Sequence, residues 1–200
     1  AANAASESAW TSPKVLGLFS LAFVLLAGFV WASQRSRIPL LRVGIFADRT
    51  YALSLVYAVL IQAVVLALGY LIPYFGQVVK SLSSFAAGCL LLPGCAIGAI
   101  LTPLGGRVMD RLGAMRPILI GAAVGVATLV LFASCGVRAT GVQLALIYTL
   151  FPVCQGLSIS NSMTNGLRSL PENLQADGNA AFNTIQQLGG AIGTAIATSI

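Results

Sequence analysis

Six long stretches without a charged residue dominate this sequence of 200 residues. They are 20, 30, 26, 21, 29 and 23 residues long, and they cover 15–34, 50–79, 81–106, 117–137, 139–167 and 178–200. An α-helix of about 20 apolar residues spans the hydrocarbon core of a bilayer, which is about 30 Å thick. The sequence therefore predicts an all-α membrane protein with six transmembrane helices.

Composition argues against the other classes of protein. Hydrophobic residues make up 58% of the chain and charged residues 8%, whereas a soluble domain is about 25% charged. Soluble core helices would show polar faces with a period of 3.6 residues, and membrane-spanning strands would alternate over segments of about ten residues. Neither pattern is sustained. The formal charge of +6 is better explained by membrane orientation than by nucleic-acid binding, so we expect no nucleic-acid partner.

Catalytic and metal-binding residues are scarce. The sequence has no histidine, and its four cysteines lie in apolar runs, where we expect them to pack as small apolar residues (Cys89, Cys95, Cys135, Cys154). We therefore expect no metal, no cofactor and no enzymatic activity. The chain starts at Ala1 without methionine and ends in an apolar run at Ile200, which suggests a piece of a longer protein.

The arginines predict the orientation of the chain in the membrane. If the loop at 35–49 is cytoplasmic, alternation puts the loops at 105–116 and 162–183 on the same side. That side then holds eight basic residues against three on the other (Arg35, Arg37, Arg42, Arg49, Arg107, Arg111, Arg116 and Arg168 against Lys14, Lys80 and Arg138). Basic residues favour the cytoplasmic side, so we expect a plasma membrane protein whose N-terminal segment lies outside.

Two predicted helices carry polar side chains within their apolar stretches. Tyr57 and Gln62 lie on the helix at 50–72, while Ser158 and Asn161 lie on the helix at 141–161. These side chains either line a polar cavity or form hydrogen bonds between helices. Small residues four apart, at Gly94 and Gly98 and again at Gly189 and Gly193, predict close helix packing.

The stretch 104–116 carries four of the sixteen charged residues and predicts a short charged hinge between two spans. Its segment Gly106-Arg107-Val108-Met109-Asp110-Arg111-Leu112-Gly113 resembles the cytoplasmic loop signature of the major facilitator superfamily, Gly-x-x-x-Asp-Arg-x-Gly. Pro93-Gly94 and the segment Phe182-Asn183-Thr184-x-x-Gln187-Leu188-Gly189-Gly190-Ala191-x-Gly193 resemble its fourteen-helix multidrug:proton antiporter branch. The resemblance runs from about Phe29 to the end of the chain.

This resemblance implies a domain organisation. Residues 1–49 would hold an external segment, one of the two extra central transmembrane helices and a cytoplasmic linker. Residues 50–200 would hold five helices of the C-terminal half of a major facilitator fold, without its last helix. The N-terminal half of the protein would lie outside this chain and would be its partner in the fold.

The resemblance also implies a function, which is secondary active export of hydrophobic or cationic drug-like compounds, coupled to protons, by alternating access. Substrate-contacting residues would be Tyr57, Gln62, Ser158 and Asn161. The charged stretch would act as a conformational latch through Gly106, Arg107, Asp110, Arg111 and Gly113; the alternative is a solvated loop that merely follows the charge rule.

The expected partners are a small-molecule substrate, protons and the lipid bilayer. No Asp, Glu, Lys, Arg or His lies within a predicted span, so we expect the proton-coupling residues in the other half of the protein. A membrane scaffold or sensor that keeps the fold without transport is the alternative function, and buried carboxylates in the other half would argue against it.

Overall fold

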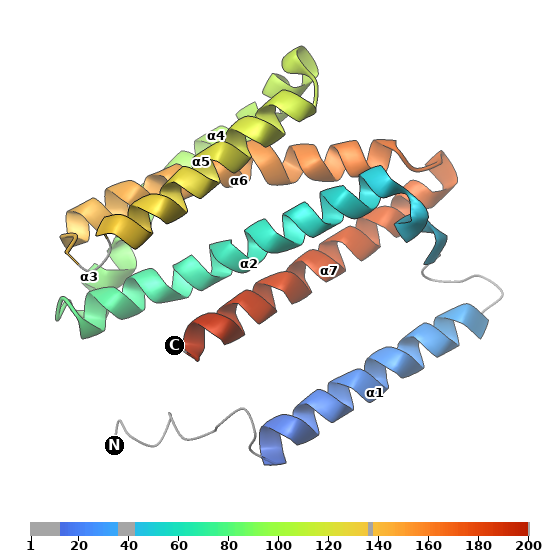
Figure 1. Ribbon diagram of the computed structural model, residues 1–200, viewed down its shortest axis with the longest axis horizontal. Coiled ribbons are helices and arrows are strands. Elements are labelled where there is room, and N and C mark those ends of the chain that lie inside the picture. Colours follow the sequence, from blue (N-terminus) through green and yellow to red (C-terminus); the bar gives the residue numbers. More distant parts are fainter. Residues whose placement is uncertain (1–12, 36–42, 136–137, 200) are drawn as a thin grey trace. The chain divides into compact units, whose positions relative to one another are not determined.

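The structure is a computed structural model, and it describes residues 13–35, 43–135 and 138–199. Every regular element in these ranges is a helix (Figure 1). The elements are α1 (Pro13–Arg35), the 3₁₀ helix η2 (Val43–Ala47), α2 (Arg49–Val78), α3 (Ser84–Cys89), α4 (Leu92–Leu112), α5 (Met115–Cys135), α6 (Gly141–Arg168) and α7 (Glu172–Thr198). They divide into two units, 1–42 and 43–200, and the second unit carries the candidate sites.

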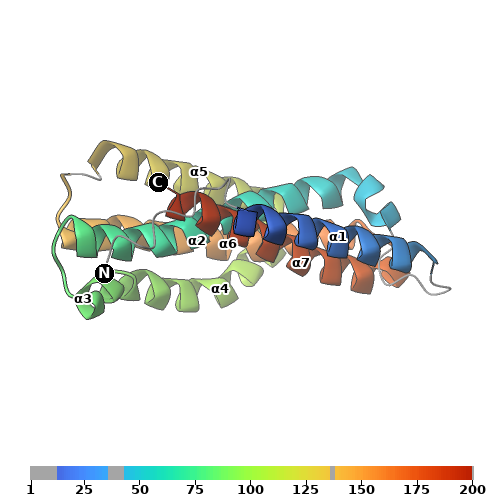
Figure 2. The same cartoon turned by 90° about the horizontal axis from the view of Figure 1, so that it is seen from below.

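Within the second unit, α6 is the central helix. It packs between α4 and α5, which lie on opposite sides of it in Figure 2, and it also contacts α2. The other extensive contact joins α2 to α7, which run side by side along most of their length (Figure 1). Buried side chains from α2 and α6 form the core, including Leu68, Ile72, Tyr148 and Phe151.

Four segments among the described residues are long and apolar enough to cross a membrane. They are Arg49–Val78, Ser84–Leu104, Met115–Cys135 and Gly141–Arg168. The all-α membrane class is therefore confirmed, and the structure supports four of the six predicted spans. Of the other two, α7 has 27 residues but many polar side chains, and the apolar part of α1 is the short segment Leu16–Leu25.

The predicted span at 81–106 is interrupted. The short helix α3 ends at Cys89, and α4 begins at Leu92 after a tight turn in which the Leu91 N–H donates to the carbonyl oxygen of Gly88 at 3.1 Å. Pro93 has no backbone N–H, and proline is tolerated in the first turn of a helix, where that donor is not needed. This explains why α4 starts here.

The charged hinge expected at 104–116 is mostly helix, so that prediction was wrong in its extent. The backbone of α4 remains helical to Leu112, and α5 begins at Met115. The chain reverses at Gly113, where φ is +77°. Glycine adopts this left-handed conformation without a steric penalty, which makes so short a reversal feasible.

The loop expected at 162–183 is also mostly helix. α6 continues to Arg168, and α7 begins at Glu172 rather than near 178. Only Ser169, Leu170 and Pro171 connect the two helices, and Pro171 disfavours helical geometry at Leu170. The polar residues after Pro171 suggested a loop because hydropathy alone does not separate a loop from a helix with one polar side.

Candidate functional site

A buried polar junction lies where α2, α5 and α6 meet. Ser158 and Cys154 on α6 are fully buried, and the hydroxyl of Tyr57 on α2 lies close to both side chains. Gly121 and Gly125 on α5 make room for them: a Cβ at Gly121 would overlap Ser158 Oγ, and one at Gly125 would lie 2.7 Å from Cys154 Sγ. Within the described part of the chain, the Tyr57 and Ser158 hydroxyls have no hydrogen-bond partner.

Asn161 lies close to Ser158 on α6 and is 1% exposed. Its Nδ2 donates to the carbonyl oxygen of Leu157 at 2.7 Å. The structure therefore brings Tyr57 and Ser158 together. It buries the side chains of Ser158 and Asn161 where the helices of this unit pack against one another. That these residues line a substrate cavity remains a prediction.

Gln62 lies on a different boundary, between α2 and α7. Its Oε1 accepts a hydrogen bond from Gln186 Nε2 at 3.2 Å. The sequence predicted two alternative roles for Gln62, in a polar cavity or in a hydrogen bond between helices. This hydrogen bond is the second of them. It does not exclude the other role, because Gln62 is only half-buried.

Glycines bring the α2 and α7 backbones close together on either side of this pair. A Cβ built at Gly189 would lie 2.6 Å from Val59 Cγ1, and one at Gly193 would lie 2.6 Å from Ala63 Cα. The α4–α6 boundary has the same character, since a Cβ at Gly94 would lie 2.6 Å from the Tyr148 ring and one at Gly98 would lie 3.1 Å from Pro152 Cβ. At Gly94, Gly189 and Gly193 a Cβ would come closer than 3.0 Å to its neighbours, so a larger residue requires the neighbouring atoms to move. At Gly98 the neighbouring Pro152 would have to shift by only a few tenths of an ångström.

The proposed latch residues lie at the end of α4 and in the turn after it. Gly106, Arg107, Asp110 and Arg111 have helical backbone, and their side chains lie outside the described part of the structure. Gly113 forms the turn to α5. The latch remains a prediction.

A cluster of hydrogen bonds at the same end of the unit was not predicted from the sequence. Asp48 caps α2 by accepting from the Tyr51 N–H at 2.8 Å, and its Oδ1 also accepts from the Ser169 hydroxyl at 2.7 Å. Both hydrogen bonds lower the pKa of the Asp48 carboxyl, and the bond from Ser169 has the larger effect. The capping role could have been read from an aspartate before an apolar run, but its partner is 121 residues away.

Two buried hydrogen bonds extend this cluster into the helix contacts. The hydroxyl of Tyr51 donates to the carbonyl oxygen of Gly178 on α7 at 2.7 Å. The Ser162 hydroxyl donates to the backbone carbonyl oxygen of Ser54 at 3.1 Å. The start of α2 is thereby joined to the end of α6 and the start of α7. We call this group the capping cluster (Asp48, Tyr51, Ser54, Ser162, Ser169 and Gly178).

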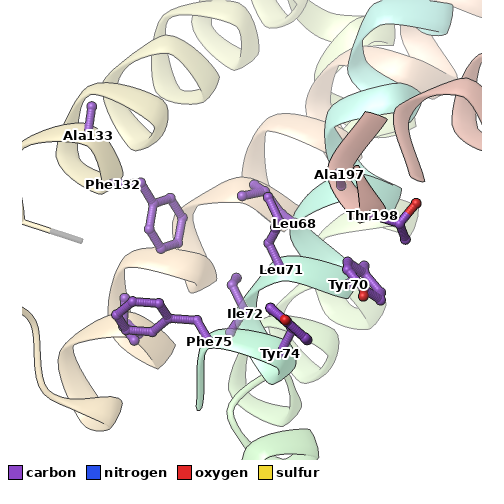
Figure 3. Close-up of a pocket in the computed structure, with 11 residues that line it drawn as sticks. Leu68, Tyr70, Leu71, Ile72, Tyr74, Phe75, Phe132, Ala133, Ala197 and Thr198 are labelled. Atoms are coloured by element: carbon purple, nitrogen blue, oxygen red, sulfur yellow. The ribbon is translucent and has the colours of Figure 1, made fainter. Parts of the chain in front are cut away.

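A cavity of about 430 Å³ lies near the opposite ends of these helices (Figure 3). Its walls are largely apolar, and Tyr70 and Tyr74 stack with ring centroids 5.6 Å apart at one side. Its volume is in the range of small-molecule sites. It contains none of the four predicted cavity residues; it is lined by Leu68, Tyr70, Leu71, Ile72, Tyr74, Phe75, Phe132, Ala133, Leu144, Ala197 and Thr198.

Long apolar helices that approach one another at glycines and exchange interhelical hydrogen bonds define this chain as an integral membrane protein. The family model of the Major Facilitator Superfamily matches residues 5–194, and the chain belongs to that superfamily. The predicted family is therefore confirmed.

Several curated proteins are similar to this chain. The lincomycin resistance protein LmrB of Listeria monocytogenes is 30% identical over 198 residues, which are 99% of this chain and 42% of the relative. The lincomycin resistance protein LmrB of Bacillus subtilis is 30% identical over 96% of this chain and 40% of its own length. The multidrug resistance protein Stp of Mycobacterium tuberculosis is 34% identical over 56% of this chain. The chain thus spans about two fifths of the length of the first two relatives.

Proposed function

We propose that this chain is the C-terminal part of a secondary active transporter that exports drug-like compounds by alternating access. The observation that carries the proposal is the superfamily match over residues 5–194, together with relatives named for resistance to lincomycin and to several drugs. In this proposal residues 1–49 supply an external segment, an extra central helix and a cytoplasmic linker. Residues 50–200 supply five helices of the C-terminal half, in the plasma membrane.

The packing of α2 to α7 suits a part that moves as one body. Transporters of this kind rock one half against the other around a site near the middle of the membrane. The capping cluster joins α2, α6 and α7 at one end, and close glycine contacts join α2 to α7 and α4 to α6 along their lengths. Rigid coupling within the half leaves the boundary between halves as the place for motion.

The four cavity candidates differ in what they can reach. Tyr57 and Gln62 are half-buried, whereas Ser158 and Asn161 are 0% and 1% exposed. We therefore expect Tyr57 and Gln62 to contact a substrate, and Ser158 and Asn161 to influence it by positioning α2 and α6. Proton coupling would use acidic residues outside this chain, since its predicted spans carry no Asp, Glu, Lys, Arg or His.

A substitution in the proposed latch tests alternating access most directly. In the complete transporter, Asp110→Asn should lower the rate of lincomycin efflux from loaded cells at least tenfold, because a neutral amide loses charge-assisted bonds to guanidinium groups and helix ends. Glu172→Gln, an acidic residue at the start of α7, is the matched control and should leave efflux unchanged.

Amounts of both variants in the membrane are measured by immunoblot, so that a loss of protein is not read as a loss of transport. Addition of a protonophore should stop efflux by the wild type if protons drive it. Wild-type rates for Asp110→Asn at equal abundance would refute the latch. Cells with and without the complete gene can also be compared directly. If both export lincomycin and several other drugs at the same rate, the alternative function of a membrane scaffold or sensor is favoured.

A further inference from the structure

The exposed surface of α7 has two different sides. Leu188, Ile192 and Ile196 are 50%, 59% and 53% exposed and form an apolar row at a spacing of four residues. Asn179, Asn183 and Gln187 are also exposed and form a second row at the same spacing. At 3.6 residues per turn the two rows lie about 180° apart around the helix. We call the second row the carboxamide row.

The carboxamide row is poorly suited to lipid. Transfer of a polar amide into hydrocarbon without a hydrogen-bond partner costs several kcal/mol of free energy, whereas transfer of a leucine or isoleucine side chain is favourable. The apolar row can therefore face lipid, and the carboxamide row requires water, protein or a ligand. Its polarity also helps to explain why α7, although 27 residues long, is not apolar enough to count among the candidate spans.

The row reaches the middle of the helix. Asn183 and Gln187 lie two residues on either side of Ile185, the centre of α7, which is about 3 Å along the axis. The neighbouring Gln186 donates to Gln62 at 3.2 Å, and Gln62 lies near the centre of the candidate span α2. Asn183 and Gln187 therefore lie level with the central part of α2.

The chemistry of the row suits uncharged polar groups. Asn183 Nδ2 donates to the carbonyl oxygen of Asn179 at 2.9 Å and to its Oδ1 at 3.1 Å, which orients the Asn183 side chain. Gln187 is exposed and makes no hydrogen bond among the described residues. A carboxamide both donates and accepts hydrogen bonds and carries no charge, so it pairs with hydroxyl and amide groups and offers no counter-ion.

We propose that Asn179, Asn183 and Gln187 line the substrate path and bind hydroxyl and amide groups of the exported compound. This inference rests on the proposed export function and narrows its substrate class. The row accounts for recognition of polar uncharged groups, while contacts with apolar parts of the compound come from other surfaces.

The first test asks whether the row faces water, and it does not depend on transport. Asn183→Cys, Gln187→Cys and the control Ile192→Cys are made in the complete protein without its native cysteines. They are treated in membranes with methanethiosulfonate ethyltrimethylammonium, a charged reagent that reacts with thiolates in water. We expect Asn183→Cys and Gln187→Cys to react at least tenfold faster than Ile192→Cys. Equal rates would show the row covered by protein or lipid and would overturn the inference.

The second test asks which compounds the row recognises. Chloramphenicol carries hydroxyl and amide groups without a charge, whereas tetraphenylphosphonium is a cation without hydrogen-bonding groups. Asn183→Ala and Gln187→Ala should each reduce efflux of chloramphenicol about threefold to tenfold, as expected for one lost hydrogen bond, and leave efflux of tetraphenylphosphonium unchanged. Ile192→Ala is the control and should change neither.

The outcomes separate this inference from the proposed function. A wild type that exports tetraphenylphosphonium alone, or alanine variants that affect both compounds equally, would overturn the substrate class while export stands. A wild type that exports none of chloramphenicol, tetraphenylphosphonium and lincomycin in any drug-susceptible host would overturn the substrate class together with the export function. Fluorescence-detected size exclusion confirms that each variant is folded before its rates are compared.

Discussion

Replacement of Gly193 by alanine tests the close approach of α7 to α2. A Cβ at this position would lie 2.6 Å from both Cα and the carbonyl carbon of Ala63, and it would overlap the carbonyl oxygen of the same residue. Carbon atoms in good contact are about 3.5 to 4.0 Å apart. The two backbones must therefore separate locally by about 1 Å, which also loosens the contact of Gly189 with Val59, one turn away.

The cost follows from the rigidity of the atoms involved. Backbone atoms of a helix cannot rotate out of the way as the end of a side chain can, so the overpacking penalty of about 1 to 3 kcal/mol applies. At roughly 2 to 4 °C per kcal/mol for a domain of this size, the melting temperature should fall by about 2 to 12 °C. It is measured on the purified protein in detergent, by loss of the monodisperse peak after heating.

Gly69→Ala is the matched control on the partner helix. A Cβ at Gly69 would meet no described atom within 4 Å, and alanine is favoured over glycine in a helix by about 0.5 to 1 kcal/mol. Its melting temperature should equal or exceed that of the wild type. Equal melting temperatures for Gly193→Ala and Gly69→Ala would refute the backbone contact between α2 and α7.

Two further predictions concern the capping cluster. Tyr51→Phe leaves the buried carbonyl oxygen of Gly178 without its donor and should cost about 1 to 3 kcal/mol in thermal stability, whereas Tyr70→Phe, whose side chain is partly exposed, should cost little; equal losses would contradict the buried hydrogen bond. Because the pKa of Asp48 is lowered in the folded state, its bonds stabilise the protein above the ordinary value of about 3.9 and are lost as the pH falls through the lowered pKa. Melting temperatures from pH 5 to pH 2 should therefore fall less for Asp48→Asn than for the wild type, and parallel profiles would show that Asp48 makes no such contribution.

The sequence predicted helix positions well and helix ends less well. Runs of apolar residues located α2, α4, α5 and α6 because lipid solvation selects long uncharged segments. The helical extensions at 105–112 and 172–177 were missed because a helix that leaves the bilayer becomes polar, and its composition then resembles that of a loop. Hydropathy reports the solvent around a segment and says little about its backbone conformation.

The candidate sites show the same division. The glycine spacing indicated close packing, and the family signature was recognisable from a few residues in order. The hydrogen-bond partners of Asp48, Tyr51 and Gln62 could not be recognised from the sequence, because they lie 121, 127 and 124 residues away in the chain. Nor could the sequence separate Ser158, which is fully buried, from Gln187, which is exposed, because both are uncharged polar residues on a helix.

The amino-acid sequence was enough to predict an all-helical membrane protein that resembles the major facilitator superfamily, because bilayer solvation and a short sequence signature are local properties of a chain. The tertiary structure was needed to show which glycines meet which helices, where polar side chains are buried, and which side of α7 is exposed among the described residues. These are consequences of helix rotation and of contacts between distant residues. A rotation of 100° per residue turns a single position from the packed side to the exposed side, and linear order does not record it.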